Sequence, residues 1–245
     1  MVRIFDYETR RKAILTATIN KYIQEATPVA SEDIASDFDL SSATIRNIFA
    51  ELEESGYLIH PYTSGGRIPT HKGYRYYVDF LISQRELKDL EKESIVKEYE
   101  SRINRLEDAL EKTSEVLSTV THCAGIVSSL DWQDRFFYRG ISFILEQPEF
   151  RDYARIRLLI KIIEDKRRLL DIINQEFKER VRIYIGDELG CCEMDSCALV
   201  VSNYYVKNKP QGRLAVLGPM RMAYKHVIPT LEYTSEVLTE VLERI

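Results

Sequence analysis

One short stretch of the chain, Ser41 to Asn47, carries the side chains best suited to chemistry with a nucleic acid. Arginine can pair with guanine through two hydrogen bonds, and asparagine can pair with adenine in the same way. Hydroxyl groups can contact phosphates, and a small alanine can contact a thymine methyl group. These residue types predict a surface that contacts base edges in a DNA groove. The candidate contacts are Ser41, Ser42, Ala43, Thr44, Arg46 and Asn47.

A predicted helix positions these residues. Apolar residues recur in it at the spacing of a single buried stripe, and Ser41 or Ser42 can cap its first turn. The polar residues then lie on the opposite face near the N-terminal end, which is the part of a recognition helix that contacts bases. A surface helix with a solvated polar face would show the same pattern. The apolar stripe consists of Ile45, Ile48, Phe49 and Leu52.

The segments before this helix predict a helix-turn-helix. An amphipathic stripe indicates a first helix over roughly residues 6–25, which ends before Pro28. Ser31 can cap a short second helix, and Asp39-Leu40 forms the turn before the candidate recognition helix. Two helices joined by so short a turn are typical of this DNA-binding motif.

The segment after the helix predicts a wing, which is a pair of strands beside the recognition helix. Residues 57–60 and 67–69 would form the strands, and a glycine-rich loop would join them. The glycines would let the backbone approach phosphates, and Arg67 would supply a cation at the tip. An ordinary β-hairpin is the alternative. The wing candidates are Ser64, Gly65, Gly66 and Arg67.

Composition limits the classes of function. The chain of 245 residues has a net charge of −5, and residues 1–85 hold 10 Lys/Arg against 11 Asp/Glu. DNA binding would therefore need a local arrangement of cations. No signal peptide or membrane-spanning run is visible and the four cysteines are expected as free thiols, so we expect a cytoplasmic protein. No catalytic constellation, metal cluster or nucleotide loop stands out, so we expect neither an enzyme nor a cofactor.

Residues 86–120 predict one long helix with a heptad stripe. The stripe could pack on a second copy of the same helix or on a helix from the C-terminal half of the chain. We favour self-association, because a reader of an inverted DNA repeat needs two-fold symmetry. The stripe consists of Tyr99, Ile103, Leu106, Leu110, Thr113, Leu117 and Val120.

The last part of the chain predicts a small antiparallel sheet covered by helices. Residues 135–145 are expected to be helical, and a long helix is expected to end near Lys178. Alternating residues predict strands over 181–185, 197–206 and 213–217, and a final amphipathic helix follows. The predicted fold class is α+β, with an N-terminal winged helix-turn-helix, a long linker helix and a small C-terminal antiparallel-sheet domain.

Five segments of the first 79 residues form a specific pattern: Thr27-Pro-Val-Ala-Ser31, Leu40-Ser-Ser-Ala-Thr-Ile-Arg-Asn47, Gly56-Tyr-Leu58, Pro61-Tyr-Thr-Ser-Gly-Gly-Arg-Ile-Pro-Thr70 and Gly73-Tyr-Arg-Tyr-Tyr-Val-Asp79. Together they closely resemble the winged-helix domain of the HrcA family, the heat-inducible transcription repressors of bacteria. The run from Pro61 to Val78 is unusually long for a chance match.

The resemblance implies a repressor of heat-shock and chaperone genes that binds an inverted-repeat operator on double-stranded DNA as a homodimer. It also implies that the chaperonin is a partner. By matching positions, the groove contacts would be Ser41, Ser42, Thr44, Arg46 and Asn47, and the wing contacts would be Ser64, Gly65, Gly66 and Arg67.

The C-terminal part also resembles this family, whose C-terminal domain is similar to a GAF sensory domain. Matching residues include Ile185-Gly186 and Leu217-Gly218-Pro219. The family carries further strands and an inserted dimerising domain before the position of Tyr138, so this domain looks abridged. We therefore expect three parts: a winged-helix domain over 1–84, a linker and dimerisation helix over 85–122, and an abridged GAF-like domain over 123–245. The alternative function is a ligand-sensing or protein-interaction module whose winged helix does not bind DNA.

Overall fold

The computed structural model describes residues 2–61, 65–81, 87–99, 103, 105–132, 135–207 and 209–245, with the side chains of residues 2–6 and 81 excepted. The chain forms two compact units, Met1–Ser83 and Gln84–Ile245. None of the helices in the described residues is both long and apolar enough to cross a membrane.

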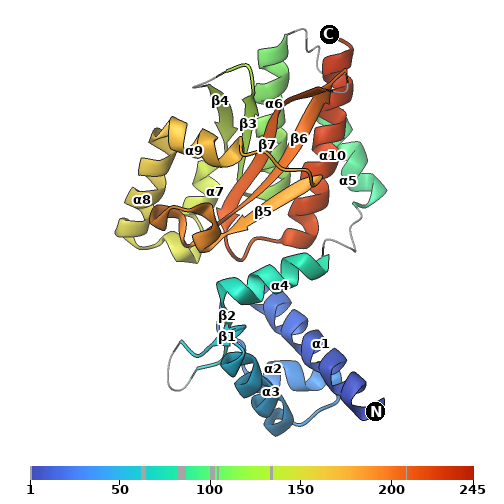
Figure 1. Cartoon of the computed structure of the whole chain (residues 1–245), viewed down its shortest axis with the longest axis vertical. Coiled ribbons are helices and arrows are strands. Elements are labelled where there is room, and N and C mark those ends of the chain that lie inside the picture. Colours follow the sequence, from blue (N-terminus) through green and yellow to red (C-terminus); the bar gives the residue numbers. More distant parts are fainter. Residues whose placement is uncertain are drawn as a thin grey trace. The chain divides into compact units, whose positions relative to one another are not determined.

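The first unit is a helical bundle with a two-stranded antiparallel sheet (Figure 1). Ile45, Ile48, Phe49 and Leu52 are each at most 2% exposed, so the predicted stripe of the third helix is its buried face. Asp39 ends the short 3-10 turn in the left-handed conformation (φ 51°), which lets the chain reverse between the second and third helices. The elements are α1 (Val2–Glu25), α2 (Ser31–Ala35), η1 (Ser36–Phe38), α3 (Ser42–Glu54), β1 (Leu58–Ile59), β2 (Ile68–Pro69) and α4 (His71–Leu81).

Polar contacts hold the first helix against its neighbours. The hydroxyl of Tyr77 on α4 donates to Asn20 on α1, and burial raises the pKa of Tyr77 to about 12.

At the start of α2, Ala30 is the capping residue, and its backbone N–H donates to Asp33 at 2.8 Å. The expected cap, Ser31, is instead the first residue of the helix and is buried.

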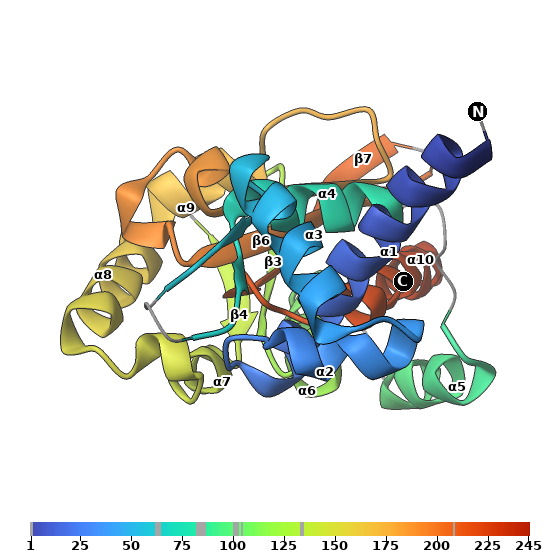
Figure 2. The ribbon, with the colours of Figure 1, turned by 90° about the horizontal axis from the view of Figure 1, so that it is seen from below.

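The second unit is built on a five-stranded antiparallel sheet in the order β4-β3-β7-β6-β5. Helices α8 and α9 pack on one face of this sheet, while α6 and α10 contact its strands from the other (Figures 1 and 2). The elements are α5 (Asp89–Glu98), α6 (Leu106–Thr121), β3 (Ala124–Ser129), β4 (Phe136–Arg139), α7 (Ile141–Leu145), η2 (Pro148–Phe150), α8 (Tyr153–Glu164), α9 (Lys166–Ile173), β5 (Val181–Ile185), η3 (Gly186–Leu189), η4 (Cys192–Met194), β6 (Cys197–Val206), β7 (Lys209–Pro219) and α10 (Tyr224–Glu243).

The segment expected as one long linker helix differs in the structure. It contains two helices, α5 and α6, and Ile103 between them is not helical. The heptad stripe packs within the chain. Tyr99 donates to Thr113 at 2.7 Å and belongs to a cluster with Val237 of α10, and Ile103 and Val120 pack against the same cluster. The stripe therefore meets a C-terminal helix of the same chain, which was the second of the two expected partners.

The sheet has more strands than the three expected. The sequence Ala124–Ser129 forms β3, which is buried on both faces and therefore shows no alternation of polar and apolar residues. Residues 136–139, expected as helix, form the edge strand β4, and Gly140 (φ 82°) separates it from α7. The expected long helix before Lys178 is two helices, because Asp165 leaves the helical conformation and caps α9 through the N–H of Arg168.

Candidate nucleic-acid interface

The N-terminal end of α3 presents its polar residues to solvent. Ser41 caps the helix by accepting a hydrogen bond from the N–H of Thr44 at 3.1 Å, and the two hydroxyl groups lie 2.9 Å apart. Ser41, Ala43, Arg46 and Asn47 are exposed, while Ser42 and Thr44 are half-buried. This end of the helix is therefore available to a ligand from the outside of its unit.

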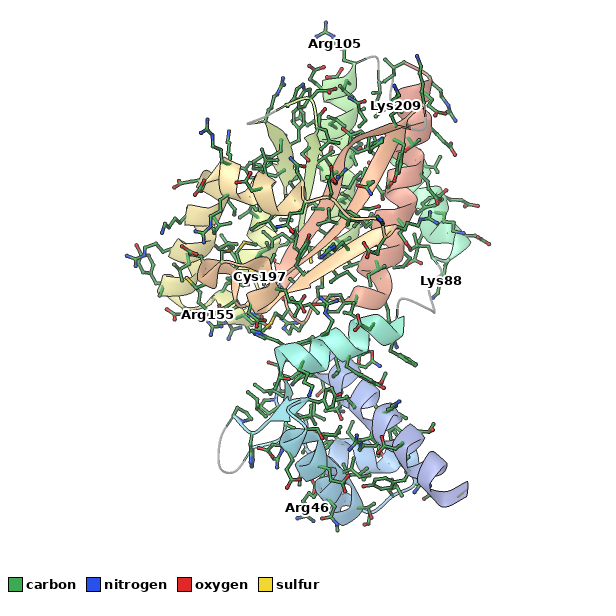
Figure 3. All side chains as sticks on the ribbon, viewed as in Figure 1. Arg46, Lys88, Arg105, Arg155, Cys197 and Lys209 are labelled. Atoms are coloured by element: carbon green, nitrogen blue, oxygen red, sulfur yellow. The ribbon has the colours of Figure 1, made fainter. Side chains whose placement is uncertain are left out.

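Arg46 and Asn47 keep their donor groups largely free. The Nε atom of Arg46 is 3.4 Å from the carbonyl of Ser42, a long and weak contact. No described residue forms a hydrogen bond with the side chain of Asn47. Figure 3 shows Arg46 projecting from α3 away from the body of its unit. Both side chains can therefore turn toward a base edge without breaking a strong internal bond.

The carboxylates at the other end of α3 are engaged inside the unit. Glu51 accepts a hydrogen bond from the hydroxyl of Tyr7 at 2.7 Å, and this bond is the main reason that the pKa of Tyr7 is raised. Glu53 pairs with Arg67 at 2.9 Å. Two of the three negative charges at this end are thus partly neutralised or hydrogen-bonded by the protein itself.

Arg67 lies at the root of the wing, and this differs from the free cation expected at its tip. Its backbone N–H and carbonyl both bond to Val29, at 2.8 and 2.9 Å, which adds a third short segment beside β2. Its side chain is only 18% exposed and reaches Glu53 of α3. The charge of Arg67 therefore connects the wing to the recognition helix.

The two glycines of the wing also have structural roles. A Cβ atom on Gly66 would lie 2.3 Å from the carbonyl carbon and oxygen of Val29, so only glycine fits where the two backbones cross. The carbonyl of Gly65 lies 2.7 Å from Nε2 of His60 across the loop. Ser64, the remaining wing candidate, lies outside the described residues.

A cleft of about 470 Å³ separates the wing root from the start of α2 and from α3. Arg46 lines one side of it, His60 and Gly65 line another, and Ser31 and Glu32 lie at the start of α2. Sequence reasoning missed His60 and Ser31 as members of this surface. His60 directly follows β1 in the sequence, and that position was the one available signal that it lies beside the wing.

An exposed recognition helix, a helix-turn-helix and a wing whose root is fixed to them define a winged-helix DNA-binding protein as the class of this molecule. Residues 7–79 match the family model for the winged helix-turn-helix transcription repressor, HrcA DNA-binding, and residues 128–228 match the model for the HrcA protein C terminal domain. The chain belongs to the HrcA family. This family consists of transcription repressors and not of enzymes.

Curated relatives agree over nearly the whole chain. The heat-inducible transcription repressors HrcA of Carboxydothermus hydrogenoformans and Geobacter sulfurreducens are each 29% identical to it. The alignments cover 96% and 97% of this chain and 98% and 99% of those proteins. The first alignment runs over 335 residues, 90 more than the 245 of this chain, so it includes positions that have no counterpart here.

One solved structure has the same fold. The crystal structure of a hypothetical protein superposes with a TM-score of 0.82 at 18% sequence identity, and the match covers 96% of this chain and 98% of that chain. At this identity the similarity concerns the fold.

Proposed function

We propose that this protein represses heat-shock and chaperone genes in the cytoplasm by binding an inverted-repeat operator through α3 and the wing. The observation that supports the proposal most directly is the exposed polar end of α3. Arg46 and Asn47 would contact base edges, Ala43 would contact a thymine methyl group, and the hydroxyl groups of Ser41, Ser42 and Thr44 would position the backbone. Arg67 and Gly66 would act by holding the wing in place.

The proposed binding unit is a homodimer, because an inverted repeat presents the same half-site twice about a two-fold axis. We expect this dimer to form through a surface other than the heptad stripe of residues 99–120, since that stripe packs within the chain. The chaperonin as a partner is carried over from the family resemblance alone.

A gel-shift titration against salt tests the DNA-binding step. We expect an inverted-repeat duplex to bind better than a scrambled duplex of the same length, with affinity that falls steeply as salt rises, because each phosphate contact releases counterions. Arg46→Ala should weaken operator binding by ~1–3 kcal/mol and reduce the difference between operator and scrambled DNA, because it removes a base contact. The substitution lies on an exposed face, so circular dichroism should show an unchanged fold.

Equal affinity for both duplexes would contradict the proposal. It would favour the second candidate, a ligand-sensing or protein-interaction module whose winged helix does not bind DNA. This candidate is supported by the slight excess of acidic residues in the first 85 positions, with 10 Lys/Arg against 11 Asp/Glu.

A further inference from the structure

One row of the sheet in the second unit is polar where the rest of that face is apolar. Arg213 on β7 lies directly opposite Ser128 of β3 and Asn203 of β6, and residues opposite each other point to the same face. Ala215 and Leu217, two and four residues further along β7, belong to the apolar core under α8 and α9. Arg213 therefore lies at the end of that core, on the same face.

Arg213 is a buried cation that forms no ion pair among the described residues, although the carboxylate of Glu176 is near enough to favour its charged form. It is 5% exposed, and its Nε atom has no hydrogen-bond partner. One of its terminal nitrogens lies 3.4 Å from the carbonyl of Gly212, and the guanidinium carbon lies 5.3 Å from the ring centre of Phe177. Buried charges in proteins are normally paired, because removing them from water is costly. Burial accordingly lowers the pKa of Arg213.

The groups around Arg213 suit a polar ligand with an apolar body. Asn203 is 8% exposed, and its Oδ1 atom also has no partner. The segment between α9 and β5, residues 174–180, is the strap that covers this end of the sheet: Asn174 accepts from Ser128 at 3.1 Å, and Gln175 accepts from Tyr184 at 3.1 Å. The rings of Phe177 and Tyr184 supply apolar surface beside these polar groups.

We propose that Arg213 anchors a small carboxylate with an apolar or aromatic body, bound on this sheet face beneath the strap. The planar guanidinium group matches a carboxylate through two parallel hydrogen bonds, and it would use the Nε donor that is now unpaired. The side-chain N–H₂ group of Asn203, on the neighbouring strand, would donate a second hydrogen bond to the carboxylate. Phe177 covers the guanidinium group in the ligand-free protein and moves aside with the strap when the ligand enters.

Thermal unfolding of the full chain, followed by tryptophan fluorescence, tests this site independently of DNA binding. Trp132 is the single tryptophan and belongs to the second unit, so its signal reports on the unit that contains Arg213. The probe is benzoate, and benzamide is the uncharged control of the same shape. The variants are Arg213→Met and Arg244→Met. Arg244 is the matched control because it belongs to the same unit, its side chain is 75% exposed, and it pairs with Glu240 of α10, away from Phe177 and Tyr184.

Benzoate at ten times its dissociation constant should raise the unfolding midpoint of the wild type by roughly 3 °C. Arg244→Met should retain this shift, whereas benzamide on the wild type and benzoate on Arg213→Met should give none. Without ligand, Arg213→Met should unfold at the same temperature as the wild type or higher, because it removes a buried charge that has no partner.

Three results would overturn the proposal. The first is the absence of any shift with benzoate at concentrations up to roughly 10 mM, because a site of ordinary ligand affinity would be occupied at that concentration. The second is the same shift in Arg213→Met. The third is an unfolding midpoint, measured without ligand, that lies several degrees below that of the wild type in Arg213→Met and falls by the same amount in Glu176→Gln. This result would show that Glu176 of the strap is an internal counterion for Arg213.

Discussion

Arg67 shows how one residue type can serve either binding or architecture. Its sequence position after two glycines is typical of a cation that contacts phosphate. In the structure its backbone pairs with Val29 and its side chain pairs with Glu53, so its groups are used inside the unit. Arg46, by contrast, has only a long contact to the carbonyl of Ser42. The difference between these two arginines is set by their neighbours.

This difference predicts distinct effects on DNA binding. Arg67→Ala should weaken operator binding by loosening the wing, but the slope of affinity against salt should stay unchanged, because no phosphate contact is lost. Glu53→Gln should also weaken binding, because it breaks the ion pair with Arg67. The loss of a negative charge would by itself strengthen DNA binding, so a weaker complex would point to the wing. A salt titration by fluorescence anisotropy checks both. A slope reduced by about one in Arg67→Ala would show instead that Arg67 contacts a phosphate.

Among the elements, α3 depends on its capping residue, Ser41, for both stability and binding. Ser41 satisfies the N–H of Thr44, one of the N–H groups that a helix start leaves without partners. The same residue lies on the exposed face that we propose for DNA. Substitutions at this position can therefore separate the folding of the helix from its function.

Two substitutions of Ser41 make the separation measurable. Ser41→Ala should destabilise the protein by ~1 kcal/mol, because the cap is lost. Ser41→Asp should retain the cap and the stability, since aspartate is an equally good capping residue, yet it should weaken DNA binding because its carboxylate repels phosphates. Urea unfolding and gel shifts on both variants check the pair. Normal operator binding by Ser41→Asp would place the start of α3 away from the DNA backbone.

The other elements show where periodicity misleads. The heptad stripe of residues 99–120 is real, since Leu110, Thr113 and Leu117 are fully buried, but its partners are α5, α10 and the sheet. A repeat of apolar residues identifies a buried face without identifying what covers it. In the same way, the stripe that predicted one helix before Lys178 continues through α9, and only the capping contact of Asp165 reveals the break.

For the whole molecule, we expect the number of chains bound to an operator to follow the number of its half-sites. We expect two chains on a duplex with both half-sites and one chain on a duplex with one half-site scrambled, because each half-site accommodates one recognition helix. Analytical ultracentrifugation of the complexes gives these masses directly. A single chain on the complete inverted repeat, bound with full affinity, would contradict the proposed homodimer.

The sequence by itself determined the winged helix and the exposed end of α3. Spacing fixes which side of a helix is buried, and the short turn before α3 and the strands after it leave few arrangements for so small a unit. The exposure of Arg46 and Asn47 could therefore be inferred from the buried stripe on the opposite face of the helix, which consists of Ile45, Ile48, Phe49 and Leu52. These are local properties, set by neighbours in the sequence.

The tertiary structure alone decided the role of Arg67, the strand β3 and the burial of Arg213, because the contacts responsible join residues far apart in the chain. Val29 and Glu53 assign Arg67 to the wing root, and the pairing of β3 with β7 makes Ala124–Ser129 a strand although it has no alternating pattern. Burial of Arg213 between Ser128 and Asn203 likewise appears only when three strands come together. Hydrogen bonds and ion pairs between distant segments leave no periodic signal in a single sequence, and only the folded chain brings such partners together.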